Sequence, residues 1–169
     1  MPLQLSTRGR YGVRLMVALA LNHESVTGGS DGSRGISLLR EIALQEGISE
    51  KYLGQIIIPL RASGLVASHR GAHGGYSLGR PPSEITVKDV VEAIEGAIAP
   101  VPCVDPAAGA SRSECAEEAD GSLRATSRAT TRVWRKLHDQ IVDTLGSFTL
   151  QALAREARDS GQPLENYVI

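Results

Sequence analysis

Apolar residues recur at helical spacing between positions 50 and 60 and form one stripe. The stripe comprises Leu53, Ile56, Ile57 and Leu60. Ser49 stands before it as a helix N-cap, because a serine hydroxyl can accept a hydrogen bond from an amide of the first turn. Gly64 follows it and suits a left-handed cap. The pattern predicts a helix over 49–64 with polar positions near its start, off the buried stripe.

Two short strands are predicted directly after this helix, over 65–70 and 76–78. The turn between them, Gly-Ala-His-Gly-Gly, supplies the positive φ that a tight hairpin needs. A helix with a polar N-terminal end followed by a basic hairpin favours the recognition helix and wing of a winged helix-turn-helix. A helix packed on a hairpin without any ligand is the alternative, which this stretch alone does not exclude.

The flanking segments shift the balance toward the first interpretation. A short helix is predicted over 37–46, and Gly47 stands in the tight link between two crossed helices. A first helix is expected over 6–22, capped by Ser6 or Thr7, and a glycine- and serine-rich loop over 24–35. Thr86 and Asp89 form a capping box at the start of a helix over 86–95.

A long helix is predicted over 124–147, because large apolar residues repeat there at spacings of three and four. The stripe could cover its own domain, but a short winged domain has little free core, so we favour a dimer seam. The seam residues are Trp134, Leu137, Ile141 and Leu145, with Phe148 after them.

The expected fold is mainly α with a small β wing: a winged helix-turn-helix plus a long C-terminal dimerisation helix. Four parts are expected along the chain. They are a DNA-binding domain (1–96), a cysteine-containing loop (97–123), the dimerisation helix with a following short helix (124–158) and a flexible C-terminal tail (159–169).

Composition excludes several classes of protein. No run of about 18 apolar residues predicts a membrane span, and no apolar region follows the N-terminus as in a secretory signal. Two cysteines do not make a disulfide scaffold, so a cytoplasmic setting is expected. The four histidines are scattered, and neither a catalytic set nor a phosphate-binding glycine loop is present, so we expect no enzyme.

The charge distribution favours binding of a polyanion by the N-terminal half of the chain. Residues 1–80 carry nine Lys and Arg against five Asp and Glu, whereas residues 81–169 carry nine against fourteen. The basic part therefore contains the helix-turn-helix. Gln55 can bond an adenine edge, and Arg70 can meet a phosphate or the minor groove. The predicted DNA-contacting residues are Arg8, Ser49, Lys51, Tyr52, Gln55, His69, Arg70 and His73.

Four separated segments together resemble the Rrf-two family of bacterial transcription regulators, in the order in which that family carries them. The segments are LSTRGRYG (5–12), SEKYLGQIIIPLRASGLVASHRGAHGGYSLGR (49–80), ITVKDVVEAIEG (85–96) and VWRKLHDQIVDTLGSFTLQALA (133–154). The resemblance implies a winged-helix homodimer that binds operator DNA. The branch of the family that represses cysteine metabolism is the most similar.

Cluster-binding relatives hold three cysteines in the loop before the long helix. The resemblance matches Cys103 and Cys115 to the outer two, whereas Gly109 stands at the middle position and Glu118 where some relatives have a histidine. A [2Fe–2S] cluster needs four ligands, usually thiolates, so two would have to come from Asp105, Glu114, Glu118 or a partner chain. We therefore expect no cofactor, and keep a cluster or a thiol redox switch at these two cysteines as the alternative.

The C-terminal tail is polar but finishes with Tyr167, Val168 and Ile169. Such an end could simply anchor on its own domain. Asn-Tyr-Val-Ile also resembles the C-terminal peptide with which serine acetyltransferase enters cysteine synthase, and the cysteine-metabolism branch is held on DNA by that enzyme. The resemblance implies a sulfur-metabolism repressor with cysteine synthase as its partner.

Overall fold

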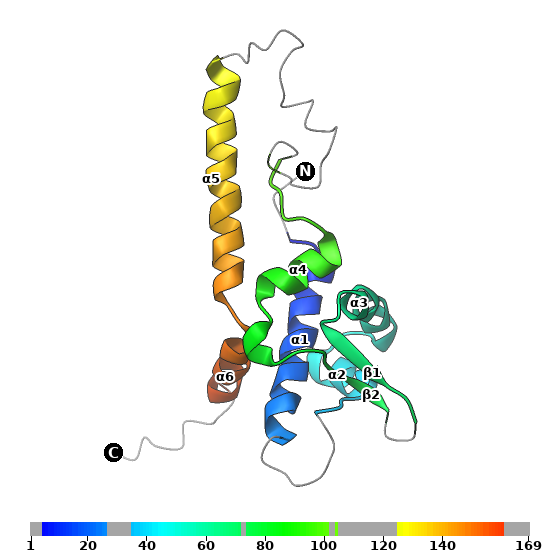
Figure 1. Cartoon of the computed structure of the whole chain (residues 1–169). Helices are drawn as coiled ribbons and strands as arrows, with labels where there is room; N and C mark the ends of the chain where they lie inside the picture. The colour runs from blue at the N-terminus through cyan, green and yellow to red at the C-terminus, as the bar shows by residue number, and fades with distance from the viewer. Residues whose placement is uncertain (1–4, 27–34, 72–73, 102–103, 105–124, 161–169) are drawn as a thin grey trace, which may run out of the picture.

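The computed structural model describes residues 5–26, 35–71, 74–101, 104 and 125–160. Figure 1 shows α1 crossing the body with α4 and α6 near it, the hairpin and α3 to one side, and α5 projecting away. This is the mainly helical fold with a small wing that the sequence predicts. The elements are α1 (Thr7–Val26), α2 (Leu39–Glu46), α3 (Glu50–Ala62), β1 (Val66–His69), β2 (Gly75–Leu78), the 3-10 turn η1 (Pro82–Glu84), α4 (Val87–Glu95), α5 (Ala125–Ser147) and α6 (Leu150–Ser160).

The stripe of α3 is buried as predicted. Leu53, Ile56 and Leu60 are fully buried, and Ile57 is 2% exposed. They pack in one aliphatic core with α1, whose Leu15 contributes to its centre. Each such side chain stabilises the fold by about 1.5–3 kcal/mol relative to an exposed one. The core therefore fixes which side of α3 faces outward.

Both ends of α3 are formed as the sequence predicts. The Ser49 hydroxyl accepts from the Tyr52 amide at 3.2 Å. At the other end, the amide of Gly64 donates to Arg61 O and that of Leu65 to Leu60 O. This pair of bonds is the Schellman motif, and Gly64 adopts the positive φ of 73° that it requires.

The hairpin pairs β1 with β2 in antiparallel register, with Val66 opposite Leu78 and His69 opposite Gly75. The strand ends differ by at most one residue from the predicted 65–70 and 76–78. Ser37 adds a bridge on the other side of β2: its amide donates to Tyr76 O at 2.8 Å, and the Tyr76 amide donates back to Ser37 O at 2.9 Å. The wing is thereby joined to the segment before α2.

Two predicted helix boundaries were wrong. The second helix begins at Leu39 rather than at residue 37, because Ser37 pairs with the hairpin and Leu38 has extended backbone angles. The first helix continues to Val26, into the predicted loop over 24–35. No glycine or proline occurs from residue 13 to residue 27, so nothing in the sequence stops the helix at residue 22.

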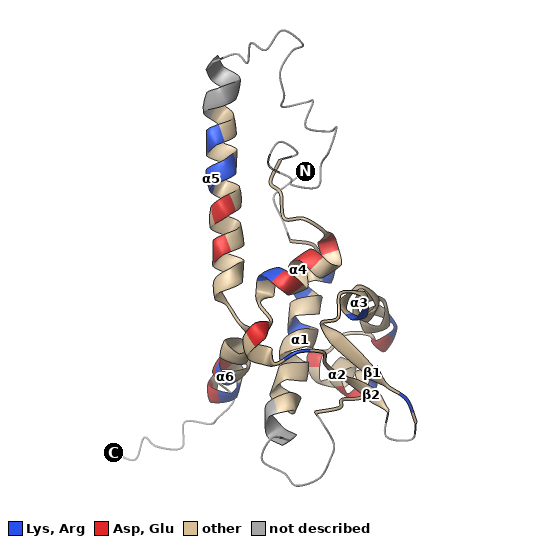
Figure 2. Ribbon diagram, in the orientation of Figure 1, with Lys and Arg blue, Asp and Glu red and all other residues tan. Residues whose placement is uncertain are grey.

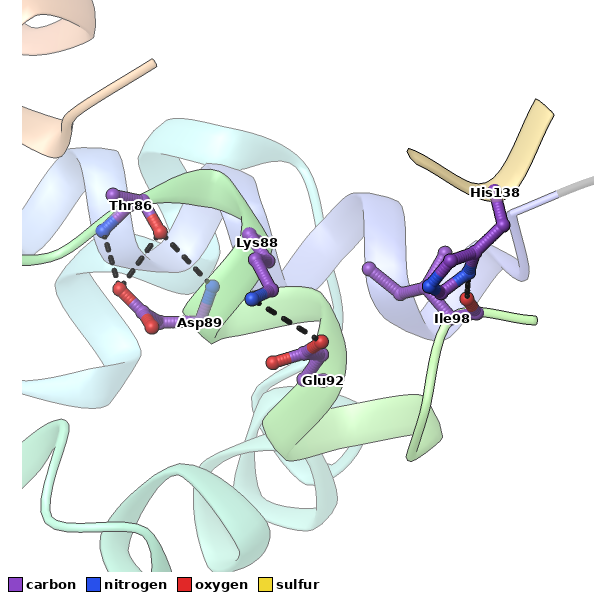
Figure 3. Close-up of polar contacts among 6 residues, drawn as sticks. All are labelled: Thr86, Lys88, Asp89, Glu92, Ile98 and His138. Carbon is purple, nitrogen blue, oxygen red and sulfur yellow. Dashed lines mark hydrogen bonds and ion pairs between the residues drawn. The ribbon is translucent and has the colours of Figure 1, made fainter. Parts of the chain in front are cut away.

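The capping box of α4 is present, with Thr86 Oγ1 accepting from the Asp89 amide at 3.2 Å and Asp89 Oδ2 accepting from the Thr86 amide at 2.8 Å (Figure 3). Beside it, the backbone joins the start of α6 to the start of α4, because the Leu150 amide donates to Ile85 O at 2.9 Å. Leu150 and Ala154 of α6 are fully buried in the common core. Helix α6 thus packs with the helix-turn-helix, although the sequence groups it with the dimerisation helix.

Candidate nucleic-acid interface

The N-terminal part of α3 presents polar side chains away from the core. Ser49, Lys51 and Gln55 are exposed. Tyr52 is half-buried, because its ring packs edge-on against Tyr11 of α1 with the centroids 6.0 Å apart. Of the four residues predicted here, Lys51 and Gln55 are exposed without such a contact, Ser49 is exposed while its hydroxyl caps the helix, and Tyr52 is partly covered.

Arg8 lies against the recognition helix. Its Nη2 donates to the main-chain carbonyl of Gln55 at 3.3 Å. In an α-helix this carbonyl would accept from the amide four residues later, but that residue is Pro59, which has no N–H. Arg8 therefore donates to a carbonyl that the proline leaves open, and the residue is exposed.

Arg14 makes its contacts with side-chain and main-chain groups of α2 and with a ring of α1. Its guanidinium pairs with Glu46 Oε2 at 2.7 Å and donates to Glu46 O at 2.8 Å. It also lies over the Tyr11 ring, 5.6 Å from the centroid. These contacts tie α1 to the end of α2, where a cation suits the helix C-terminus. Arg14 therefore acts within the helix-turn-helix.

Ser6 and Glu95 form a contact that sequence reasoning did not find. Glu95 Oε1 accepts from the Ser6 amide at 3.2 Å and from the Ser6 hydroxyl at 2.8 Å. The same hydroxyl accepts from the Gly9 amide at 3.1 Å, so Ser6 is the N-cap of α1. The two residues are 89 positions apart, and local patterns carry no signal for such a pair.

The wing residues differ in their surroundings. Arg70 is exposed just after β1. The ring of His69 is half-buried, with Nε2 at 2.8 Å from Ser77 Oγ on the opposite strand. This contact links the His69 ring to the opposite strand of the hairpin. A role of His69 in DNA binding stays a prediction. His73 lies outside the described residues.

Charge is distributed unevenly over the elements. Helix α3 carries Lys51 and Arg61 but also Glu50, and Arg70 follows β1. Figure 2 shows residues of both signs on α6. Along α5 the order is reversed from what the helix dipole favours, since cations come first and Asp139 and Asp143 follow. The cations are Arg132, Arg135 and Lys136.

The predicted dimer residues lie on a helix that is only partly covered. Leu137, Ile141 and Leu145 are half-buried, and Trp134 is 38% exposed. The covered side faces α4 and the chain after it, where His138 Nδ1 lies 2.7 Å from Ile98 O (Figure 3). Val133, which the predicted stripe omits, is 58% exposed. The outer side of α5 therefore presents large apolar groups.

The remaining predicted residues are outside the described part of the chain. They are Cys103, Cys115, Tyr167, Val168 and Ile169. No group of three potential metal ligands occurs within the described ranges. The helices of these ranges include none long and apolar enough to cross a membrane.

The resemblance to cluster-binding relatives implies that further ligands would come from the first helix, at the positions of Arg8 and Gly12. Arg8 is a cation, and Gly12 is enclosed so closely that an added Cβ would overlap the Ile94 side chain. Two cysteines leave two of the four ligands of a [2Fe–2S] cluster to other residues, and the expectation of no cofactor stays a prediction.

Comparisons with known proteins agree with this geometry. A family model described as "Rrf2: Iron-dependent Transcriptional regulator" matches residues 5–156. The transcriptional regulator CymR of Bacillus subtilis is 36% identical over 152 residues, 90% of each chain.

Solved structures give the same result. That of CymR, the global cysteine regulator of B. subtilis, superposes with a TM-score of 0.66 at 35% identity, covering 90% of this chain and 97% of that one. That of T. potens IscR gives 0.68 at 33%, covering 96% and 94%. The chain belongs to the Rrf2 family of DNA-binding transcriptional regulators.

Proposed function

We propose that this regulator is a homodimeric, sequence-specific repressor of genes of cysteine and sulfur metabolism. The observation that carries DNA reading is the exposed N-terminal part of α3, with Gln55 outward, beside a hairpin whose Arg70 is exposed. The similarity to CymR, which extends over 90% of both chains, supports the metabolic role. Operator DNA is the first partner.

The homodimer is proposed to form through α5. Within the described part of the chain, no ion pair is formed by the five central charged residues of α5, which are Arg132, Arg135, Lys136, Asp139 and Asp143. If two copies of α5 cross in opposite directions, the basic turns of one meet the acidic turns of the other. The apolar side chains of Val133, Trp134 and Leu137 then lie between them. Two recognition helices could thus meet successive major grooves, roughly 34–36 Å apart.

Cysteine synthase is the proposed second partner, through the C-terminal tail. A terminal carboxylate can be gripped by backbone amides of a binding cleft, while the Ile169 side chain fills an apolar pocket and Tyr167 adds an amphipathic contact. The enzyme would bind this tail when its acetylserine substrate is scarce. The complex then reports sulfur supply to the operator.

Calorimetric titration with cysteine synthase of the same organism tests the partner. We expect parent protein to bind, and both removal of Ile169 and addition of one residue after it to abolish binding. Ala157→Ser, on the exposed side of α6, is the control and should bind like the parent. Unchanged affinity of the shortened chain for cysteine synthase would show that the tail is not the binding segment. DNA binding by each variant, measured in parallel, shows that the regulator itself is intact.

A further inference from the structure

The N-terminus of α1 is capped by two helices together. In a capping box, the residue three places after the N-cap supplies a carboxylate to the N-cap amide. Here that place is Gly9, and the carboxylate comes from Glu95, the last residue of α4. Ser6 completes the box by accepting from the Gly9 amide at 3.1 Å.

Gly9 makes this arrangement sterically feasible. A Cβ at position 9 would overlap Glu95 Oε1, and it would lie 3.0 Å from Cδ of the same side chain. Because the carboxylate is the far end of a flexible side chain, an added methyl group would displace Glu95 rather than the backbone. Substitution of Gly9 is therefore a second way to break the contact between Ser6 and Glu95.

The capped turn also carries the residue that contacts the recognition helix. Arg8 is two residues after Ser6, and its Nη2 reaches Gln55 O at 3.3 Å. Gln55 is exposed and is the side chain predicted to contact a base. The contacts thus run without a break from Glu95 through Ser6 and the first turn of α1 to Arg8 and then α3.

We propose that Glu95 is a positioning residue for DNA recognition, which holds the first turn of α1 so that Arg8 supports the helix that carries Gln55. Direct electrostatics predicts the opposite effect of losing this carboxylate. An anion near a DNA-binding surface repels phosphate, so its removal alone would strengthen binding to any duplex. Loss of positioning instead weakens binding to the preferred sequence and spares non-specific binding.

The probe is a fluorescent duplex that the parent protein selects from a randomised library, and a scrambled duplex of the same length measures non-specific binding. For Glu95→Ala we expect the dissociation constant for the selected duplex to rise roughly fivefold to tenfold, the scale of a lost cap contact. The dissociation constant of this variant for the scrambled duplex should equal that of the parent or be lower. Glu95→Gln keeps an acceptor oxygen and should retain most of the preference.

Gly9→Ala should reproduce the loss in the parent and add nothing in Glu95→Ala, because the methyl group then has room. Glu84→Ala, at an exposed glutamate of η1, is the matched control and should bind like the parent. Thermal unfolding confirms that each variant is folded. The proposal is wrong if Glu95→Ala binds the selected duplex as tightly as the parent, if both duplexes weaken equally, or if the two losses add.

Discussion

Arg8 Nη2 donates a hydrogen bond to the main-chain carbonyl of Gln55, four residues before Pro59, at 3.3 Å. The proline has no amide hydrogen to donate to this carbonyl, so the guanidinium of Arg8 in α1 completes the hydrogen bonding of α3. Arg8 was predicted as a DNA contact from its position alone. The structure adds that the same side chain is hydrogen-bonded to the recognition helix at the residue that is expected to contact a base.

Gln55→Ala is expected to relax base preference at a single operator position. An amide side chain can bond an adenine edge through two atoms, and its loss should cost about 1–3 kcal/mol there. Competition binding against a panel of single-base variants of the selected duplex measures this. Gln140→Ala, an exposed glutamine of α5, is the control. Equal preference in Gln55→Ala and parent would place base reading elsewhere.

Arg70→Ala is expected to weaken binding to all duplexes alike. A cation that contacts phosphate or the minor groove acts mainly by releasing counterions, so the slope of log K against log salt should fall by about one. Titrations at several salt concentrations give this slope. Arg155→Ala on α6 should leave it unchanged. A parent-like slope in Arg70→Ala would mean that the wing does not contact the duplex.

Ile141→Asp is expected to dissociate the dimer. An unpaired carboxylate in the seam costs several kcal/mol, since nothing there compensates its lost hydration. Sedimentation equilibrium should show a monomer, and affinity for the selected duplex should drop with it. Thr144→Asp, exposed on the same helix, is the matched control. If Ile141→Asp stays dimeric, the interface lies on another surface.

Thr86→Ala is expected to lower the free energy of unfolding by about 1 kcal/mol, because it removes the hydroxyl that accepts from the Asp89 amide and donates to Asp89 Oδ2, whereas the backbone amide at this position remains. Lys88→Ala, which breaks only the pair with Glu92 at 3.8 Å on the same helix, should cost about 0.2–0.5 kcal/mol. Denaturant unfolding of both variants distinguishes the two effects. Equal losses would mean that the cap contributes no more than a surface ion pair.

Cys103→Ser and Cys115→Ser are expected to leave DNA binding intact under reducing conditions if the cysteines are plain thiols. Peroxide that abolishes binding only in the parent would reveal a redox switch. The visible spectrum of protein purified without oxygen is the complementary measurement. Charge-transfer absorbance in the parent, lost in both variants together with DNA binding, would establish a cluster after all.

Local chemistry was enough to predict much of this fold. Ser49, Gly64 and Thr86 end or begin helices where the sequence places them, because caps act within one turn. The buried stripe of α3 also follows from its spacing. The boundary at Leu39 could not be predicted, since it depends on Ser37 pairing with a hairpin about forty residues later, at Tyr76.

The candidate site was likewise predictable only in part. Lys51, Gln55 and Arg70 are exposed where their positions on the helix and hairpin suggest. Whether a polar side chain is free or engaged depends on distant partners, which periodicity does not encode. His69 contacts Ser77 across the strands, and Glu95 reaches Ser6 from the far end of another helix.

The bridge between Ser37 and Tyr76 has a consequence for solubility. A two-stranded hairpin has two open edges, and an open edge is a template on which a second chain can add a strand. Ser37 occupies both hydrogen-bonding groups of Tyr76 on the outer side of β2, and its hydroxyl accepts from Asn22 Nδ2 at 2.8 Å. Strand addition at this edge is thereby blocked, which protects the hairpin from aggregation through β2.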